Sequence, residues 1–446
     1  MPAVALGSQN SADRSRPNII FILADDLGYG DLGCYGQKRL QTPHIDRLAA
    51  EGLKFSQAYS GSTVCAPSRC VLMTGKHLGH ATVRGNKRPE LGLAPGEETV
   101  ASLLRKSGYR TAMFGKWGLG GPGTGSTPNR RGFDEFYGYF DQLHAHNFYP
   151  EHLWDNENEV FLTQNWFSGR KQYAPDLTTD KTVEFLKRKH DKPFLLFVTY
   201  TMPHANNELG HATGDGMEVP PGSKYLKESW PAPERGFAAM MERLDGYVGR
   251  IAATLRETGL ESNTVLFFTS DNGPHREGGH DPDFFQSRGP LRGIKRDLYE
   301  GGIRVPFIAR WPGHIGPDRT TEAVVMFQDV LPTFAELAGV KAPASDGRSF
   351  ASLFRGGSLP APKYLYWEFH EAGFSQAVRI GNWKGVRRDV GKPVELYDLA
   401  SDLSESVDVA SSHPDVVKRI EEVMRSARAE NPNFPIVRGG SSNTPI

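Results

Sequence analysis

The sequence predicts an α/β protein with a large doubly wound sheet, mixed and mostly parallel, flanked by helices. Short apolar runs alternate with segments of helical spacing along most of the chain. Of the 446 residues, 38% are hydrophobic, which is enough for one large core and a smaller second one. Charged or amide side chains follow several of the apolar runs, as expected where a parallel sheet forms a binding site.

Five apolar runs are expected to be buried parallel strands of this sheet. They are continuously apolar instead of alternating, which is typical of strands covered on both faces. The runs are Asn18–Leu23, Tyr109–Phe114, Phe194–Tyr200, Thr264–Thr269 and Arg304–Ala309.

Helical spacing lies between these runs and after the last one. The longest example is Arg235–Arg256, where apolar residues recur every three or four positions. Two segments rich in Gly and Pro, Gly118–Gly132 and His204–Glu234, are expected to be loops over the sheet edge. The other expected helices are Ile45–Glu51, Thr99–Lys106, Lys181–Lys187 and Asp329–Leu337.

The chain is expected to divide into a disordered segment at 1–16, a large domain at 17–357 and a smaller unit with a tail at 358–446. The boundary falls in Gly356–Pro362, which is rich in Gly and Pro. Beyond it, short strand-like segments predict an antiparallel sheet, and Pro414–Ala429 predicts a helix that packs with it. The four segments are Tyr364–Phe369, Gln376–Ile380, Trp383–Val386 and Glu395–Asp398.

Composition excludes several classes of partner. Lys+Arg and Asp+Glu are equal at 52 each, so no overall field favours nucleic acid, and no apolar run reaches membrane-spanning length. Three cysteines, Cys34, Cys65 and Cys70, leave room for at most one disulfide. Met1–Arg16 lacks the apolar segment of a secretory signal. We nevertheless expect a periplasmic or secreted protein whose leader is absent from this chain, and the cytoplasm is the alternative.

Polar side chains come directly after four of the expected strands. Because the carboxyl ends of parallel strands meet at one sheet edge, these residues are expected to lie together. The carboxylates and the amide offer hard oxygen ligands, which suit Ca²⁺ or Mg²⁺. Taken alone, either pair of adjacent residues also fits a turn or a helix cap. The residues are Asp25, Asp26, Lys116, His204, Asp271 and Asn272.

One short motif gives this edge a specific chemistry. Cys65 begins an expected helix that runs to about Thr74, with Pro67 in its first turn and Arg69 one turn further on. A buried structural cysteine at a helix start is the alternative reading. The spacing Cys-x-Pro-x-Arg resembles the formylglycine signature of type I sulfatases in the alkaline phosphatase superfamily, in particular bacterial arylsulfatase-type members that degrade glycans.

Other motifs extend this resemblance from Pro17 to about Ala429. Ser270–Pro274 resembles the later metal-binding motif of the family, and Tyr299–Pro306 resembles the Glu-Gly-Gly-x-Arg motif that follows its sulfate-binding lysine. The resemblance implies that Cys65 is oxidised to formylglycine by a maturation enzyme. It also implies that the modified residue binds Ca²⁺, with Mg²⁺ less favoured, together with Asp25, Asp26, Asp271 and Asn272.

The resemblance further implies the roles of the basic residues. Arg69 would stabilise the hydrated aldehyde, and Lys116 and Lys295 would bind sulfate oxygens. His204 would contact sulfate and protonate the leaving alcohol. One position departs from the family, because the usual Gly-Lys-Trp-His reads Gly-Lys-Trp-Gly here, with Gly118 in place of a histidine that helps to release sulfate. We expect another residue to supply that base: His146, His144 or His275.

The expected function is hydrolysis of a sulfate ester of a carbohydrate, with a galactose- or N-acetylgalactosamine-type 4-sulfate suggested by analogy. Ring side chains in the loops, among them Trp117, Phe140 and Phe148 and the loop histidines, are expected to stack on the sugar. Its hydroxyls are expected to bond to Arg276, Glu277 and Arg288. Two alternatives remain open at this stage: a phosphonate or phosphate ester hydrolase of the same superfamily, and a non-catalytic relative that binds sulfated glycans.

Overall fold

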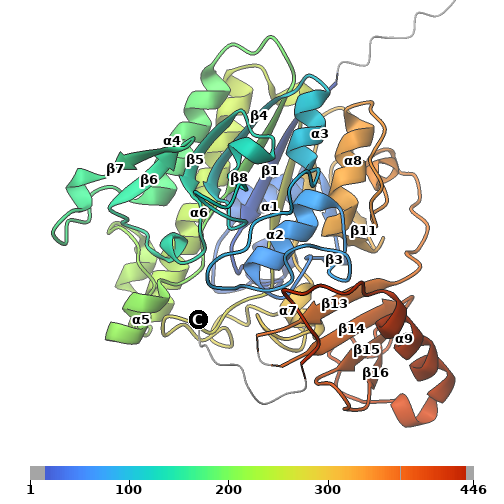
Figure 1. Cartoon of the computed structure of the whole chain (residues 1–446). Helices are drawn as coiled ribbons and strands as arrows, with labels where there is room; N and C mark the ends of the chain where they lie inside the picture. The colour runs from blue at the N-terminus through green and yellow to red at the C-terminus, as the bar shows by residue number, and fades with distance from the viewer. Residues whose placement is uncertain (1–15, 372, 438–446) are drawn as a thin grey trace, which may run out of the picture.

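A ten-stranded sheet forms the centre of the protein in a computed structural model, which describes residues 16–371 and 373–437 (Figure 1). The strand order is β11-β2-β10-β9-β1-β8-β4-β5-β6-β7. The strands are β1 Asn18–Ala24, β2 Leu53–Phe55, β4 Arg110–Lys116, β5 Glu135–Tyr139, β6 His152–Asp155, β7 Asn158–Phe161, β8 Phe194–Thr199, β9 Thr264–Ser270, β10 Phe307–Arg310 and β11 Arg319–Thr321.

The predicted fold class is confirmed, with one correction to the strand directions. The central strands β5, β4, β8, β1 and β9 are parallel to their neighbours in this group. The fifth predicted strand, β10, instead runs antiparallel to β9, so its expected direction was wrong. The chain between β9 and β10 stays at the carboxyl edge, where Gly273 donates a backbone hydrogen bond to Gly302, and therefore re-enters the sheet from that edge.

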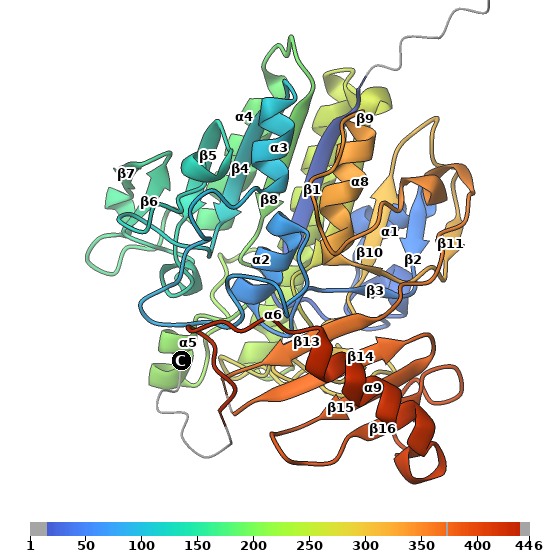
Figure 2. The ribbon, with the colours of Figure 1, turned by 45° about the vertical axis from the view of Figure 1, so that its right-hand side comes forward.

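Both faces of the sheet are covered, as the central strand β1 shows: its side chains alternate between two hydrophobic cores. Ile19, Phe21 and Leu23 pack into one core, and Ile20 and Ile22 into the other. Figures 1 and 2 show the two helical layers on either side of the sheet. The first layer contains α2 Cys65–Thr74, α3 Val100–Lys106 and α8 Val330–Leu337, and the second α1 Pro43–Ala50, α4 Ala174–Lys187 and α6 Ala232–Glu257.

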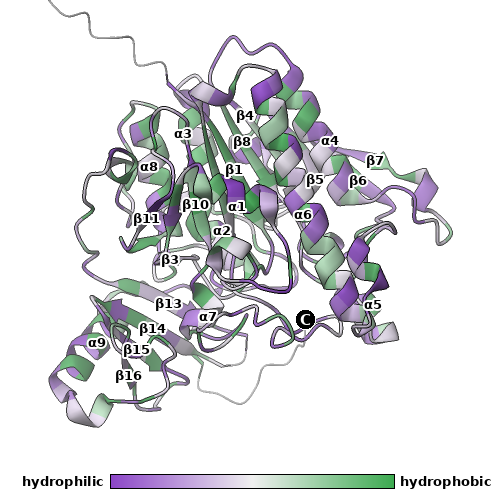
Figure 3. Ribbon diagram, turned by 180° about the vertical axis from the view of Figure 1, so that it is seen from behind, coloured by the Kyte–Doolittle hydropathy of each residue, from purple (hydrophilic) through white to green (hydrophobic). Residues whose placement is uncertain are grey.

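A separate antiparallel sheet follows near the C-terminus, in the order β13-β14-β15-β16. Helix α9, Pro414–Ser426, packs on it through Val416, Ile420 and Met424 (Figure 2). In Figure 3 the hydrophobic residues of both units concentrate in strands and inward helix faces. The strands are β13 Leu365–Phe369, β14 Ser375–Ile380, β15 Trp383–Arg387 and β16 Glu395–Asp398.

A buried ionic network joins the two sheets. Lys384 of β15 lies 2.9 Å from Glu300 and 3.0 Å from Glu405, and Glu300 belongs to the short helix α7, Glu300–Ile303. The Tyr59 hydroxyl also donates to Glu300 at 2.6 Å. Tyr59 ends β3, Ala58–Tyr59, which pairs with β12, Val325–Met326. All three ionic side chains are fully buried, so the small unit is fixed to the large one by charges without access to water.

Four further findings bear on the sequence predictions. The expected loop at 204–234 contains a short helix, α5 Asn207–Thr213, begun by an Asn206 cap that the Pro-rich composition concealed. The three cysteines are free within the described structure. None of the described helices is both long and apolar enough to cross a membrane. The predicted disordered segment lies, except for Arg16, outside the described residues.

Candidate active site

The carboxyl ends of β1, β4 and β9 bring their following residues into one buried cluster. Asp25 and Asp26 follow β1, Lys116 ends β4, and Asp271 follows β9. Their exposed fractions are 1% or less. Strand β1 is parallel to β9 and β8, and β8 is parallel to β4. The carboxyl ends of these strands therefore meet at one edge of the sheet, as the sequence predicted.

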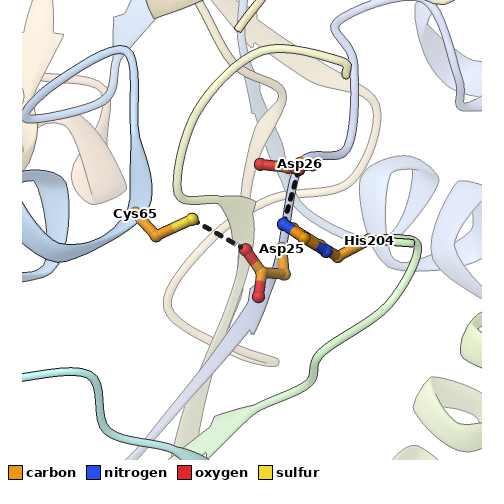
Figure 4. A group of neighbouring side chains, drawn as sticks. All are labelled: Asp25, Asp26, Cys65 and His204. Carbon is orange, nitrogen blue, oxygen red and sulfur yellow. Dashed lines mark hydrogen bonds and ion pairs between the residues drawn. The ribbon is translucent and has the colours of Figure 1, made fainter. Parts of the chain in front are cut away.

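Cys65 lies at the first position of α2 and contacts this cluster. Its Sγ is 3.4 Å from Asp25 Oδ1 (Figure 4), and the residue is 3% exposed. Burial and the Asp25 carboxylate raise the pKa of the thiol well above its usual value. The unmodified side chain is therefore a protonated thiol that donates to Asp25, which makes it a poor nucleophile as it stands.

Arg69 lies one helical turn after Cys65 and binds the opposite side of the cluster. Its Nη2 and Nε donate to Asp271 Oδ2 at 2.9 and 3.1 Å, and its Nη1 donates to the Lys116 carbonyl at 2.6 Å. This fork geometry fixes α2 against the ends of β4 and β9. Position 65 is thereby held beside the carboxylates by the next turn of its own helix.

Two buried lysines neutralise the two consecutive aspartates. Lys116 Nζ lies 2.7 Å from Asp25 Oδ2, and Lys295 Nζ lies 2.8 Å from Asp26 Oδ2. Although burial opposes it, Lys116 lowers the pKa of Asp25, and Lys295 does the same for Asp26. Both lysines therefore stay charged at the point where an anionic group would enter.

His204 is neutral and acts as a hydrogen-bond acceptor. Its Nδ1 donates to the Ala205 carbonyl at 2.6 Å, which leaves a lone pair on Nε2, and Lys295 Nζ lies 3.0 Å from that atom. Burial and the charge of Lys295 lower the pKa of His204 to about 3. Asp26 Oδ2 lies 3.3 Å from the same Nε2 (Figure 4).

The cluster fits a divalent cation. Asn272 Oδ1 is buried without a hydrogen-bond partner among the described residues, while Asn272 Nδ2 donates to Asp26 Oδ1 at 2.6 Å. Burial, followed by repulsion from Asp25, raises the pKa of Asp271 to about 7. Crowded carboxylates next to an unpaired amide oxygen form the hard donor set that Ca²⁺ or Mg²⁺ prefers.

A cavity of about 300 Å³ opens onto this cluster. Cys65, His204 and Lys295 line it together with His146, and its outer wall comes from the loops at 83–91 and 141–143. The size is that of a site for a small organic ligand. The site therefore combines positive groups, candidate metal ligands and a modifiable side chain around one enclosed volume.

The remaining predicted residues are distributed unevenly. His146 lines the cavity and stacks on His204 with ring centroids 4.8 Å apart. His275 is buried beside the cluster, but its Nε2 bonds to Pro203 O and its Nδ1 accepts from the Glu277 N–H. His144 packs against Tyr139, and Arg276 pairs with Asp281 and Asp283, and neither lines the cavity.

One residue of the site was missed, and another makes contacts that the sequence did not predict. Glu277, expected to bond the hydroxyls of the sugar, lies 3.0 Å from Lys295 and 3.3 Å from His204. Gln142 fills the space beside Gly118, where an added Cβ would lie 2.2 Å from Gln142 Nε2. Gly118 also has φ +73°, a conformation that disfavours a histidine there.

The expected stacking of aromatic rings on the substrate is wrong for the loop residues named above. Trp117, Phe140 and Phe148 are at most 1% exposed and belong to the hydrophobic cores. Trp117 Nε1 donates to Ser126 O at 2.7 Å, so this loop is anchored by its ring. The outer wall of the cavity comes from the loops at 83–91 and 141–143 instead, and its rings come from His146 and His204.

The fold and the site together define an α/β protein with a buried, positively charged centre suited to an anion. A family model described as Sulfatase matches residues 17–340, and one described as N-sulphoglucosamine sulphohydrolase, C-terminal, matches 294–430. The chain is 30% identical to N-acetylgalactosamine-6-O-sulfatase of Bacteroides thetaiotaomicron, with 94% of each protein covered. It is 32% identical to arylsulfatase A of Homo sapiens, with 91% of this chain and 87% of that protein covered.

A solved structure shows the same similarity. The crystal structure of Ps i-CgsB in complex with k-i-k-neocarrahexaose superposes with a TM-score of 0.77 at 28% identity, over 95% of each chain. The chain belongs to the sulfatase family, as the sequence motifs predicted. It is a sulfuric ester hydrolase, and its relatives include enzymes named for sulfated carbohydrates.

Proposed function

We propose that this enzyme releases sulfate from a sulfated galactose-type carbohydrate, using formylglycine formed from Cys65 and a bound Ca²⁺. The observation that carries the proposal is the position of the Cys65 thiol. It lies at a helix start, 3.4 Å from Asp25 and within one cavity with Lys295 and His204. The named activity of the N-acetylgalactosamine-6-O-sulfatase relative supports a galactose-type ring.

The chain's own residues would hold both groups. Asp25, Asp26 and Asp271 would ligate the cation through carboxylate oxygens, and Asn272 through its unpaired Oδ1. Arg69 would orient the modified residue 65 from one turn along α2. When bound, the cation would supply Lewis acidity, and the hydrated aldehyde would supply the attacking oxygen.

Sulfate would be bound by the two buried lysines. Lys116 and Lys295 are bonded to Asp25 and Asp26, so a cation at those carboxylates would free their ammonium groups to bind sulfate oxygens. His204 Nε2 accepts from Lys295, and this pair holds one proton that can pass to the leaving alcohol oxygen. The cation would thus bind the carboxylates, and the lysines would bind the oxygens of the sulfate.

Mass spectrometry combined with turnover tests the proposal. Conversion of Cys65 lowers the intact mass by about 18 Da, since oxygen replaces sulfur and two hydrogens. The converted protein is tested on galactose and N-acetylgalactosamine that carry sulfate at position 4 or at position 6. We expect it to release sulfate from at least one of these sugars. Cys65→Ala is expected to abolish release while circular dichroism stays unchanged. Turnover that survives Cys65→Ala would remove formylglycine from the mechanism.

A further inference from the structure

Of the four histidines considered for the site, His146 lines the cavity and has a ring nitrogen without a hydrogen-bond partner in the described structure. His204 Nε2 already accepts from Lys295, and both ring nitrogens of His275 are bonded to the backbone. His144 does not line the cavity. For His146, the described structure gives hydrogen-bond partners to Nδ1 and none to Nε2.

A carboxylate sets the tautomer of this ring. Glu208, at the start of α5, places its oxygens 3.2 and 3.3 Å from His146 Nδ1. A carboxylate accepts hydrogen bonds, so Nδ1 carries the proton and Nε2 keeps its lone pair. The bond to His146 is the leading cause that lowers the pKa of Glu208, which keeps it ionised. The Asn206 cap anchors the beginning of α5, because its side chain accepts from the Leu209 N–H.

The ring is also held in place by stacking. His146 and His204 are nearly parallel, with an interplanar angle of 15°, and His146 is 5% exposed. A neutral His204 below it adds no repulsion to an imidazole that gains a proton. The other charged or titratable groups of the cavity wall are Lys87, Arg88, Glu90, Asp141, Lys295 and Arg296.

We propose that His146 is the proton-accepting residue of the cavity and that Glu208 is the positioning residue that keeps its Nε2 free. The proposal rests on the proposed function. The ordinary family position for this base is occupied here by Gly118, whose neighbouring space Gln142 fills with an amide that cannot accept a proton.

The proton transfer balances as follows. The O–H bond of the free hydroxyl on residue 65 breaks, and its proton goes to His146 Nε2. The electron pair of that bond closes the carbonyl, and the C–O bond to sulfate breaks with its electrons leaving on sulfate. His146 then returns the proton to water, so no further reactant is needed.

Nitrogen NMR of histidine-labelled protein tests the tautomer without any turnover. The protein is used with Cys65 unconverted, and the His146 signals are assigned by their loss in His146→Gln. We expect the Nδ1–H tautomer in the native protein and a mixture of tautomers in Glu208→Gln. His211→Gln, an exposed change on the same helix, is expected to leave the His146 signals unchanged. An Nε2–H tautomer in the native protein, or unchanged signals in Glu208→Gln, would refute the role of Glu208.

Chemical rescue tests the proton-accepting role in the converted enzyme. His146→Gly is expected to lower kcat for an aryl sulfate by about 10²- to 10⁴-fold, with a smaller change in KM. Added imidazole is expected to restore part of kcat in His146→Gly and none in His146→Gln, whose side chain fills the space. Unimpaired turnover, or no response to imidazole, would overturn the proposal. A converted native enzyme that releases no sulfate would instead overturn the proposed function, while the NMR result still decides the His146–Glu208 pair.

Discussion

At the scale of single residues, the amide of Asn272 distinguishes a metal site from a closed ionic network. Every carboxylate of the cluster has a cationic or N–H partner, whereas Asn272 Oδ1 is buried with none in the described structure. A buried carbonyl oxygen without a partner costs free energy unless a cation or water binds it. Its position beside Asp26 would let it bind a cation without losing a proton.

Asn272→Leu is therefore expected to weaken Ca²⁺ binding by about tenfold or more, because one of few oxygen ligands is lost. Isothermal titration of the metal-free protein with Ca²⁺ measures the effect. Asn158→Leu, an exposed substitution on β7, is the matched control and is expected to bind Ca²⁺ as the native protein does. Equal affinities for the two variants would exclude Asn272 as a ligand.

The limits of sequence prediction are also visible residue by residue. Asp25, Asp26, Asp271 and Lys116 follow buried strands, so their convergence could be predicted from strand direction alone. Glu277 was expected to bond the hydroxyls of the sugar, as was Arg276. Its contact with Lys295 could not be predicted, because neighbouring residues of a loop face opposite ways and sequence does not say which. Here the His275 ring accepts the Glu277 N–H, and this turn directs Glu277 to Lys295 while Arg276 faces Asp281.

At the scale of elements, the loop at 83–91 places an unusual carboxyl in the cavity wall. Both oxygens of the Glu90 carboxyl are buried. Burial, with a smaller contribution from Asp141, raises the pKa of Glu90 to about 8, although Lys116 acts in the opposite direction. Glu90 is therefore a neutral acid at neutral pH, and its ionisation would add a negative charge beside a site for sulfate.

Glu90→Gln is expected to stabilise the protein in alkaline solution. The folded protein retains a proton that the unfolded chain releases near its ordinary pKa, so the free energy of unfolding falls as pH rises between that value and about 8. The loss is on the order of 1.4 kcal/mol for each pH unit crossed, and Gln removes it. Urea unfolding should show the stabilisation at about pH 8 and little of it at about pH 5. A stabilisation equal at both values would show that Glu90 does not titrate in this range.

The direction of strand β10 could not be predicted from the sequence pattern. A buried strand shows the same hydrophobic period and length whether it runs parallel or antiparallel to its neighbour. The apolar run that forms β10 resembles the runs of the parallel strands in composition. Its direction follows from the preceding segment, which remains at the carboxyl edge to deliver Lys295 and α7. A connection that builds the site thus replaces the crossover that a parallel strand requires.

At the scale of the whole molecule, stability depends on the charged contact between the two sheets. Lys384 forms ion pairs with Glu300 and Glu405, and all three side chains are fully buried. Burial alone would raise the pKa of Glu300, but nearby positive charges, Lys384 first, lower it to about 2. Lys384→Met is expected to cost about 3–5 kcal/mol, because it leaves two buried acids without their shared partner.

Urea unfolding at neutral pH measures this loss. Lys392→Met, an exposed change in the same small unit, serves as the control and is expected to change stability by less than about 0.5 kcal/mol. The small unit is expected to unfold together with the large one, in a single transition seen by both fluorescence and circular dichroism. Separate transitions, or a Lys384→Met protein as stable as the control, would show that the network does not couple the sheets.

The final described residues reach back to the cavity wall. The Ala429 N–H donates to the Gly79 carbonyl, and the Arg84 side chain donates to the Ala429 carbonyl. Lys87 donates to the Asn433 carbonyl and lies over the Phe434 ring. Segments that are more than 340 positions apart therefore support one another. Ending the chain before Arg428 would spare the reactive centre yet loosen the wall of the cavity, so substrate preference is expected to broaden before catalysis fails.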